Sequence, residues 1–413
     1  MEQSSGEGSL ISSKTSCILD LPPSCIEFCP AHLGYFVVGT YNLEKREDEQ
    51  TETQTGDDDE DDHQEAAASK APQSRNGSLI IFRLEEGQLH LIQTVSRPSA
   101  ILDLHFQALS GYQDIVAVVS STGTISVFRL DPGRSASEPL QALSTSRIPD
   151  IDEDVLFLSF TWHPSSPDLL AITTSTGELR LVRLDLTTFE IRASQILPVA
   201  NSLECWCVAL SPPTSREDEE QTAVLYSGGD DSVLRYISLS MPPDIDDSVL
   251  VDVPYPPAVM KKDHEAGVTA ILPLPLYLED GSRIVMTGSY DENLRIFAMQ
   301  DPQTTFGLKR TRLLADHGLG GGVWRLKVIK IDKIRGSEPS WKIRLLASCM
   351  HAGTRIVDVS ISHDGTASVE VLYRFEEHKS MNYGSDWIQA VDERGINVVS
   401  TSFYDRLLCL WQA

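Results

Sequence analysis

The stretch Thr287-Gly288-Ser289-Tyr290-Asp291-Glu292-Asn293-Leu294-Arg295-Ile296-Phe297 contains a pattern that returns along the chain. A polar turn is followed by a short strand that ends in a large apolar residue six positions after Asp291. The same spacing recurs in six further places, which are Asn76 to Phe82, Thr122 to Phe128, Thr176 to Val182, Asp231 to Ile237, His351 to Val357 and Asp405 to Trp411. Successive copies end 46 to 60 residues apart. Repetition at this length indicates one β-sheet unit made many times.

Each copy reads as short apolar strands separated by turns. In the fifth copy the expected strands are 267–272, 283–289 and 293–297. Their short length and their content of β-branched residues favour strands over helices. A period of this size fits the four-stranded blades of a β-propeller. The sequence therefore predicts an all-β fold in which residues 15–413 form one seven-bladed propeller; an eighth blade would require a copy hidden in an insert.

The two ends of the chain indicate how the ring closes. The last copy supplies strands near 386–390, 396–401 and 406–411, and the chain then stops one strand short of a full blade. The apolar segment 17–21 precedes the first copy and has no blade of its own. We therefore expect this N-terminal segment to become the outer strand of the last blade. Residues 1–14 are polar and are predicted to be a disordered N-terminus.

The charge balance limits the classes of molecule that the chain can bind. The chain has 34 basic and 60 acidic residues and a formal net charge of −26, so phosphate backbones and anionic membranes would be repelled. We expect no nucleic-acid partner and no membrane partner. Between Glu44 and Glu65 there are twelve acidic and two basic residues and almost nothing apolar. Such a run cannot form a core, so a disordered acidic loop is predicted as an insert at 45–75 in the first blade.

The seven cysteines are an odd number, and most lie in apolar runs such as the one around Cys409. This predicts small core residues in a reducing compartment. The pair in Cys205-Trp206-Cys207 is closer than the cysteine pairs of zinc sites, so neither a metal site nor a cofactor is expected. No stretch of 18 apolar residues occurs. A soluble, monomeric, cytoplasmic protein is expected, with a nuclear location left open.

The turns resemble those of WD-repeat proteins, whose blades carry a Gly-His pair, an Asp in a tight turn and a terminal Trp-Asp. Ser227 to Asp231 and Thr287 to Asp291 fit this pattern well. The blade ends depart from it, because no Asp follows the last apolar residue. The resemblance makes the predicted fold a seven-bladed WD-repeat β-propeller.

Six phrases go beyond the generic repeat, namely Gly39 to Glu44, Gly288 to Glu292, Gly320 to Lys327, Ala347 to Gly353, Tyr383 to Trp387 and Ser402 to Asp405. In this order they are similar to the diphthine methyl ester hydrolases of the diphthamide pathway, over the chain from about Pro22 to Trp411. The resemblance implies removal of a methyl ester from methylated diphthine on translation elongation factor 2, which would be the protein substrate. The freed carboxylate would then be amidated.

Hydrolysis of an ester needs a nucleophile or an activated water, a base and donors for the oxyanion. The chain has no Gly-x-Ser-x-Gly elbow, so the groups would have to come from separate blades. His351, Asp291 and Asp405 occupy equivalent turns of three successive blades, and Asp386 lies in a strand expected to line the channel. These four are the candidate catalytic residues, with His351 the preferred base because it replaces the turn Asp.

A structural explanation stands beside each of these candidates. In WD-repeat blades an Asp at this turn caps backbone amides of its own blade, which would account for Asp231, Asp291 and Asp405. His264 occupies the position of the structural Gly-His histidine.

Substrate-binding residues are expected among the aromatic and basic side chains of the six phrases. Aromatic faces attract a trimethylammonium group such as that of diphthine, or pack between blades. The glycines of Gly320-Gly321-Gly322 free the backbone to approach a ligand, or only give a flexible lead into the strand that follows. Arg325 would hold a carboxylate or phosphate-like group. The candidates are Tyr41, Tyr290, Trp324, Arg325, Tyr383 and Tyr404.

A different class of function fits the same fold. Most propellers of this type are non-catalytic scaffolds, and this chain would then recruit a partner enzyme or a trafficking complex.

Overall fold

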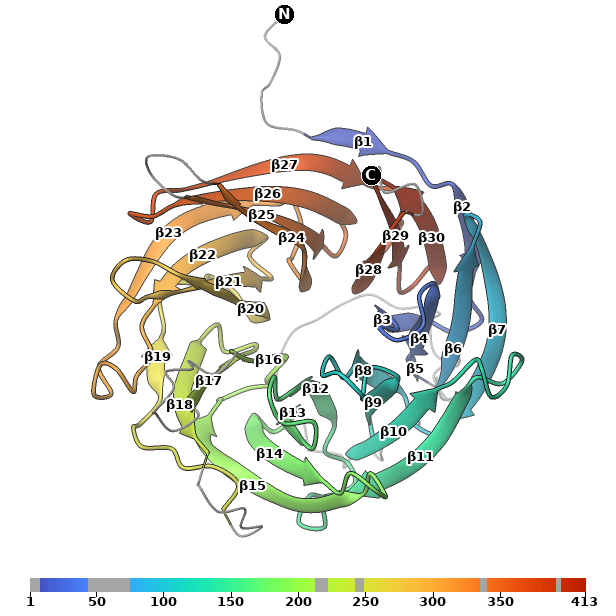
Figure 1. Cartoon of the computed structure of the whole chain (residues 1–413), viewed down its shortest axis with the longest axis horizontal. Coiled ribbons are helices and arrows are strands. Elements are labelled where there is room, and N and C mark those ends of the chain that lie inside the picture. The colour runs from blue at the N-terminus through green and yellow to red at the C-terminus, as the bar shows by residue number, and fades with distance from the viewer. Residues whose placement is uncertain (1–7, 44–74, 212–221, 242–248, 335–339, 391–394) are drawn as a thin grey trace, which may run out of the picture.

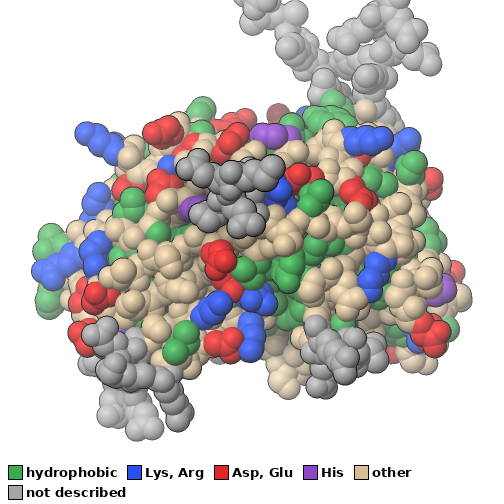
Figure 2. All heavy atoms as spheres, turned by 90° about the horizontal axis from the view of Figure 1, so that it is seen from above, with side chains coloured by type: hydrophobic (Ala, Val, Ile, Leu, Met, Phe, Trp, Pro, Cys, Tyr) green, Lys and Arg blue, Asp and Glu red, His purple; other side chains and the backbone are tan. Residues whose placement is uncertain are grey.

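The computed structural model describes residues 8–43, 75–211, 222–241, 249–334, 340–390 and 395–413. The regular structure of these residues is all β, and seven sheets surround a central axis (Figure 1). The predicted seven-bladed propeller is therefore confirmed. In this part of the chain no helix is long and apolar enough to cross a membrane. Figure 2 shows one side of the ring, where acidic and basic side chains are interspersed.

The blades are described from the channel outward, and their strands are as follows. Blade one has β3 (Pro23–Phe28), β4 (Tyr35–Thr40), β6 (Arg75–Glu85) and β7 (Gln88–Arg97), with the short β5 (Asn42–Leu43) paired to β6. Blade two has β8 (Ile101–Phe106), β9 (Ile115–Ser120), β10 (Thr124–Leu130) and β11 (Leu140–Arg147). Blade three has β12 (Phe157–Trp162), β13 (Leu169–Thr174), β14 (Glu178–Leu184) and β15 (Ile191–Ala200).

The remaining blades follow the same order. Blade four has β16 (Cys207–Leu210), β17 (Thr222–Gly228), β18 (Leu234–Ser240) and β19 (Ala258–Met260). Blade five has β20 (Val268–Tyr277), β21 (Arg283–Ser289), β22 (Asn293–Met299) and β23 (Thr311–Gly318). Blade six has β24 (Arg325–Ile334), β25 (Ser340–Ser348), β26 (Thr354–Ser362) and β27 (Ala367–Phe375). Blade seven has β28 (Gly384–Gln389), β29 (Ile396–Thr401), β30 (Leu407–Gln412) and, outermost, β2 (Thr15–Ile18).

The N-terminal segment closes the ring. β2 pairs antiparallel with β30, with Ile18 opposite Leu407, so the predicted closure is confirmed with the strand starting two residues earlier than expected. A further strand, β1 (Ser9–Ile11), pairs parallel with β27 at the outer edge of blade six. The prediction of a disordered N-terminus over 1–14 is therefore wrong for Ser9–Ile11, because this segment gains backbone partners at an open sheet edge that its own composition does not reveal.

Two sequence-based predictions concern residues that the structure does not describe. Residues 1–7 lie outside the described residues. The acidic insert was predicted at 45–75, between β5 and β6 of blade one. Its residues 45–74 lie outside the described residues, and Arg75 is the first residue of β6.

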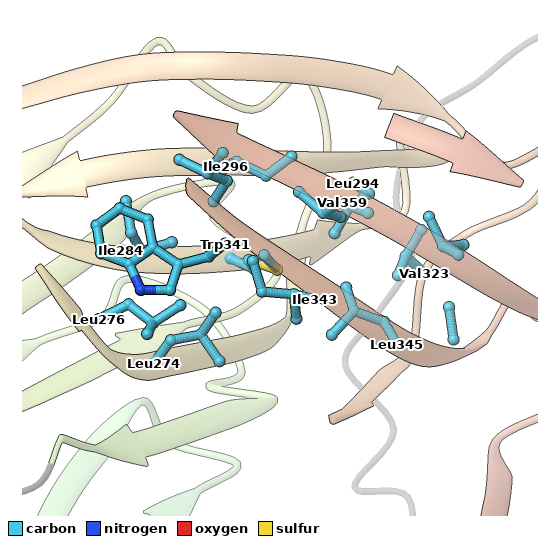
Figure 3. Close-up of a cluster of buried hydrophobic side chains, with 14 of the residues drawn as sticks. Leu274, Leu276, Ile284, Leu294, Ile296, Val323, Trp341, Ile343, Leu345 and Val359 are labelled. Atoms are coloured by element: carbon cyan, nitrogen blue, oxygen red, sulfur yellow. The ribbon is translucent and has the colours of Figure 1, made fainter. Parts of the chain in front are cut away.

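The core lies between neighbouring blades. Between blades five and six, Ile284 and Ile296 pack in one buried cluster with Trp341 and Ile343 (Figure 3). Similar clusters fill the spaces between other blades. All seven cysteines are free thiols and six of them are buried, as the prediction of small core residues requires.

Blade seven contains a buried hydrogen-bonded group. Ser400 Oγ lies 2.8 Å from Nε2 of His378 and accepts a hydrogen bond from the indole N–H of Trp411 at 3.0 Å. In blade five, His264 lies 2.8 Å from Thr287 Oγ1 in the same way, which confirms the structural explanation for His264. The group ties the last strand to the connection that precedes its blade.

We expect deletion of residues 1–18, which removes β1 and β2, to lower the melting temperature by about 5 °C or more, since each lost backbone hydrogen bond costs roughly 1 kcal/mol net. Thermal unfolding followed by circular dichroism measures this change. Deletion of residues 1–7 is the control, because it removes no described strand pairing. Equal melting temperatures for the two deletions would show that β2 does not close the ring.

Candidate functional site

One face of the ring collects most of the residues singled out in the sequence. Because neighbouring strands in a blade are antiparallel, the end of each second strand and the start of each first strand lie at the same face. We call it the turn face. It carries the turns between second and third strands and the connections between blades.

Seven aromatic side chains on the turn face form a continuous set of ring contacts. This aromatic cluster consists of Tyr41, Trp206, Tyr290, Trp324, Tyr383, Phe403 and Tyr404. The ring centroid of Trp324 lies 4.8 Å from that of Tyr383, 5.6 Å from Trp206 and 5.8 Å from Tyr290. Phe403 lies 5.5 Å from Tyr383, 6.1 Å from Tyr41 and 5.0 Å from Tyr404.

The structure thus brings together the five aromatic residues predicted to bind substrate. Their side chains pack against one another between blades, as the packing explanation requires, and their role in substrate binding stays a prediction. Trp206 and Phe403 belong to the cluster but are not among the predicted binding residues. Trp206 lies inside the pair Cys205-Trp206-Cys207, and Phe403 stands next to Tyr404.

One carboxyl group lies against this cluster. Asp230 follows β17 and sits beside Trp206 and Tyr290, and a Cβ added at Gly267 would touch both Tyr290 and Asp230. Burial raises the pKa of Asp230 above its ordinary value, and the charges of Glu204 and Asp231 add to this, although Trp206 opposes it. Burial also raises the pKa of Tyr290, with a further contribution from Asp230.

Below the aromatic cluster lies a cavity of about 320 Å³. Inner strands of blades two to six line it, namely β8, β12, β16, β20 and β24. Cys207 and Arg325 follow Trp206 and Trp324 in the chain, and both line the cavity. A smaller hollow joins Tyr383 to Arg325 and Lys327. The aromatic cluster is therefore continuous with the channel lining.

Six charged side chains from four inner strands meet in the channel. This channel charge cluster consists of Glu27, Asp103, His105, Arg325, Lys327 and Asp386. Arg325 of blade six reaches Asp103 of blade two, with 2.7 Å between Nη2 and Oδ1. His105 Nδ1 lies 2.7 Å from Glu27 Oε2, and Lys327 Nζ lies 2.9 Å from Asp386 Oδ2. Inner strands that are distant in sequence are thereby linked across the channel.

The cluster fixes the charges of its members. Burial alone would lower the pKa of His105, but Asp103 and Glu27 raise it to about 9, so the imidazole is protonated at neutral pH. Burial alone would raise the pKa of Asp103, but Arg325 and His105 hold it well below its ordinary value. Burial likewise opposes the charge of Lys327, yet Asp386 and Glu27 raise its pKa.

Two of the candidate catalytic residues have structural contacts. Asp291 accepts hydrogen bonds from the backbone N–H groups of Glu265 and Asn293 at 2.8 and 3.1 Å, and pairs with Arg295. Asp405 accepts a hydrogen bond from Ser380 Oγ at 2.8 Å and another from Lys379 N at 3.1 Å. These are the caps that the structural explanation describes. Any catalytic role of either residue stays a prediction.

The other two candidates lie in different environments. His351 is 56% exposed on the turn face, with Nε2 3.8 Å from Glu292 Oε1. Asp386 is in the channel, where it accepts a hydrogen bond from Phe28 N at 2.7 Å in addition to its pair with Lys327. Burial raises the pKa of Asp386 although Lys327 opposes this. Within the described residues no hydrogen bond or ion pair joins any two of the four candidates, and their catalytic role stays a prediction.

Two of the three glycines before Trp324 lie in tight packing. A Cβ added at Gly321 would lie 2.4 Å from the carbonyl oxygen of Cys349, and one added at Gly322 would lie 2.5 Å from Sδ of Met350. The glycines therefore let this connection approach the turn of blade six. Arg325, predicted to hold a ligand carboxylate or phosphate-like group, pairs with the carboxylate of Asp103, and its role in ligand binding stays a prediction.

The protonation of His105 can be tested through the pH dependence of the free energy of unfolding. Because its folded pKa of about 9 lies above the ordinary 6.5, its contribution to stability is fully present below about pH 6.5 and is lost as the pH rises through 9. We expect the free energy of unfolding of the wild type to fall across this range, and His105→Gln to lack that part of the fall. Urea unfolding at a series of pH values measures it, with exposed His90→Gln as the control. The same pH dependence in both variants would contradict the assignment.

Comparison with known proteins finds relatives of similar sequence. No protein-family model matches the chain. A diphthine methyltransferase homolog of Dictyostelium discoideum is 27% identical over 405 residues, covering 96% of this chain and 98% of the relative. Diphthine methyltransferase of Mus musculus is 28% identical, covering 89% of this chain and 68% of the relative. The Schizosaccharomyces pombe protein of the same name is 24% identical, covering 97% of both.

Similarity to a solved structure supports the fold and nothing beyond it. A chain in the crystal structure of the mitotic checkpoint complex aligns with a TM-score of 0.52 and 11% identity, covering 98% of this chain and 95% of that one. The chain is a homologue of the curated proteins named diphthine methyltransferase, and it has the seven blades expected of a WD-repeat propeller.

Proposed function

We propose that the chain is an esterase that removes the methyl ester from methylated diphthine on translation elongation factor 2. The observation that carries the proposal is the aromatic cluster set directly above a cavity with cationic side chains on one wall. The names of the relatives support a role in the diphthamide pathway. The resemblance of the six sequence phrases supports hydrolysis, in the cytoplasm and without a cofactor.

The two parts of the site have complementary chemistry. The faces of Trp324, Tyr290 and Tyr383 attract a trimethylammonium group by cation–π interaction. The N–H groups of Arg325 and Lys327, at the cavity wall, are donors for the ester carbonyl oxygen and for the oxyanion that develops on it.

The reaction needs a base near the aromatic cluster, and Asp230 is placed to be that base. It takes a proton from water, the resulting hydroxide adds to the ester carbon, and the tetrahedral intermediate breaks its bond to the methoxy oxygen. The protonated Asp230 gives its proton to the methoxy oxygen, which leaves as methanol, and the carboxylic acid that remains loses its proton to solvent and becomes a carboxylate. We prefer Asp230 to His351 because Asp230 touches the aromatic cluster, whereas His351 is exposed beside Glu292. The raised pKa of Asp230 also makes it a stronger base than an ordinary aspartate.

The scaffold alternative is favoured by one observation, which is that Asp291 and Asp405 are engaged as structural caps. Purified protein incubated with methylated elongation factor 2 separates the possibilities when the modified peptide is followed by mass spectrometry. Loss of one methyl group supports the esterase. No change relative to buffer favours a scaffold, and gain of a methyl group with a methyl donor present would contradict hydrolysis.

We expect Trp324→Ala to lower kcat/KM roughly tenfold or more, because a cation–π contact contributes about 1 to 2 kcal/mol when it is desolvated. Phe306→Ala is the matched control, since Phe306 is 81% exposed in the connection between β22 and β23, at the opposite face. The rate of methyl loss measures both. An equal loss in the two variants would remove the aromatic cluster from the site.

We expect Asp230→Asn to lower kcat by about 100-fold or more, the usual contribution of a general base. In the wild type, kcat falls on the acid side at a pH above the ordinary pKa of an aspartate, because the base must be ionised and its pKa is raised. Glu265→Gln, an exposed carboxylate in the connection before β20 on the same face, serves as the control. A larger loss in His351→Ala than in Asp230→Asn would make His351 the base instead.

A further inference from the structure

The cavity in the channel has an asymmetric lining. All of its charged lining residues are cations, namely His105, Arg325 and Lys327. Apolar residues such as Leu210, Leu272 and Pro273 also line it. No Asp or Glu of the described chain is among the residues that line it.

The carboxylates that balance these cations lie behind them. The side chains of His105, Arg325 and Lys327 are 27%, 26% and 26% exposed. Their partners Asp103, Asp386 and Glu27 are 1%, 8% and 16% exposed. The charge cluster is balanced as a whole, but its positive side faces the cavity.

Other hydrogen-bond donors also stabilise the negative charge of these carboxylates. Asp103 accepts hydrogen bonds from Leu104 N at 3.0 Å and from Ser159 Oγ at 2.9 Å. Glu27 accepts one from Phe106 N at 3.2 Å.

Asp386 is satisfied in the same way, by Phe28 N at 2.7 Å and Trp387 N at 2.9 Å. An arginine has five N–H donors and a lysine three, which is more than these pairs use. Donors of Arg325 and Lys327 are therefore available to an anion in the cavity.

We propose that His105, Arg325 and Lys327 form a binding site for a small carboxylate. The carboxylate group lies against the three cations, and a short alkyl part lies against Leu210 and Leu272. A cavity of about 320 Å³ admits an acid of a few carbons. That the natural occupant is the carboxylate that ester hydrolysis forms on the protein substrate rests on the proposed function. The binding of a carboxylate does not.

The test uses butyrate as the probe and butyramide as its uncharged isostere. The full chain is titrated at constant ionic strength by replacing sodium chloride with sodium butyrate. Binding is followed by calorimetry and by tryptophan fluorescence, to which Trp162 at the cavity contributes. We expect saturable binding of butyrate and at least tenfold weaker binding of butyramide. Equal binding of the two, or no saturable binding of butyrate, overturns the proposal.

Variants locate the site. Lys327→Met combined with Asp386→Asn removes one cation together with its partner, so that no buried charge is left alone, and is expected to weaken butyrate binding at least tenfold. Lys330→Met, on the same strand but outside the cavity, is expected to leave it unchanged. Should the double variant fail to fold, His105→Gln replaces it. Wild-type affinity in a folded variant of the cationic wall overturns the proposal.

The binding measurement needs no turnover, so it is independent of the esterase assay. Butyrate binding without loss of methyl from elongation factor 2 would retain the carboxylate site and remove only its assigned occupant. Loss of methyl without butyrate binding would retain the esterase and remove the site.

Discussion

Pairing of β2 with β30 is the constraint on which the channel depends, because it holds the two ends of the chain in one sheet. Closure places β3 of blade one beside β28 of blade seven. Phe28 N then donates to Asp386, and Lys327 of blade six lies 2.9 Å from Asp386 and 3.8 Å from Glu27. The charge cluster is therefore built across the seam of the ring, and it requires the seam to be closed.

The closed ring then creates two environments along one axis. At the turn face, connections from five blades place aromatic rings in contact, and this surface suits a large, weakly hydrated cation. Deeper in the channel, buried carboxylates hold three cations that point into a cavity. A ligand fits these two environments if its positive group lies at the aromatic cluster and its carbonyl or carboxyl group lies at the cations of the cavity. The proposed function and the proposed carboxylate site both use it.

Periodicity was enough to predict the blades, since the turn-to-apolar spacing depends only on local strand geometry. The third strand of the fifth copy, expected at 293–297, is Asn293–Met299, and β29 is Ile396–Thr401 as expected. The aromatic cluster was largely predictable as well, because its members stand in unusual phrases. The short β1 was not, because its stability comes from an edge of blade six rather than from its own residues.

The contacts in the channel could not be predicted from the sequence, for a different reason. Arg325 and Asp103 are 222 positions apart, and their meeting depends on the number of blades and on how deep each side chain sits along its strand. The polar residues Asp103 and His105 alternate within an apolar inner strand, which was the available signal.

The coupling between Asp103 and Arg325 tests the central claim, that distant inner strands meet in one channel. A double-mutant cycle of Asp103→Asn and Arg325→Gln, measured as free energies of unfolding in urea, gives it directly. Each single variant should lose about 3 kcal/mol or more, since it leaves its partner unpaired, and the double variant should lose at least about 1 kcal/mol less than the sum. Additive losses within about 0.5 kcal/mol would contradict a contact across the channel.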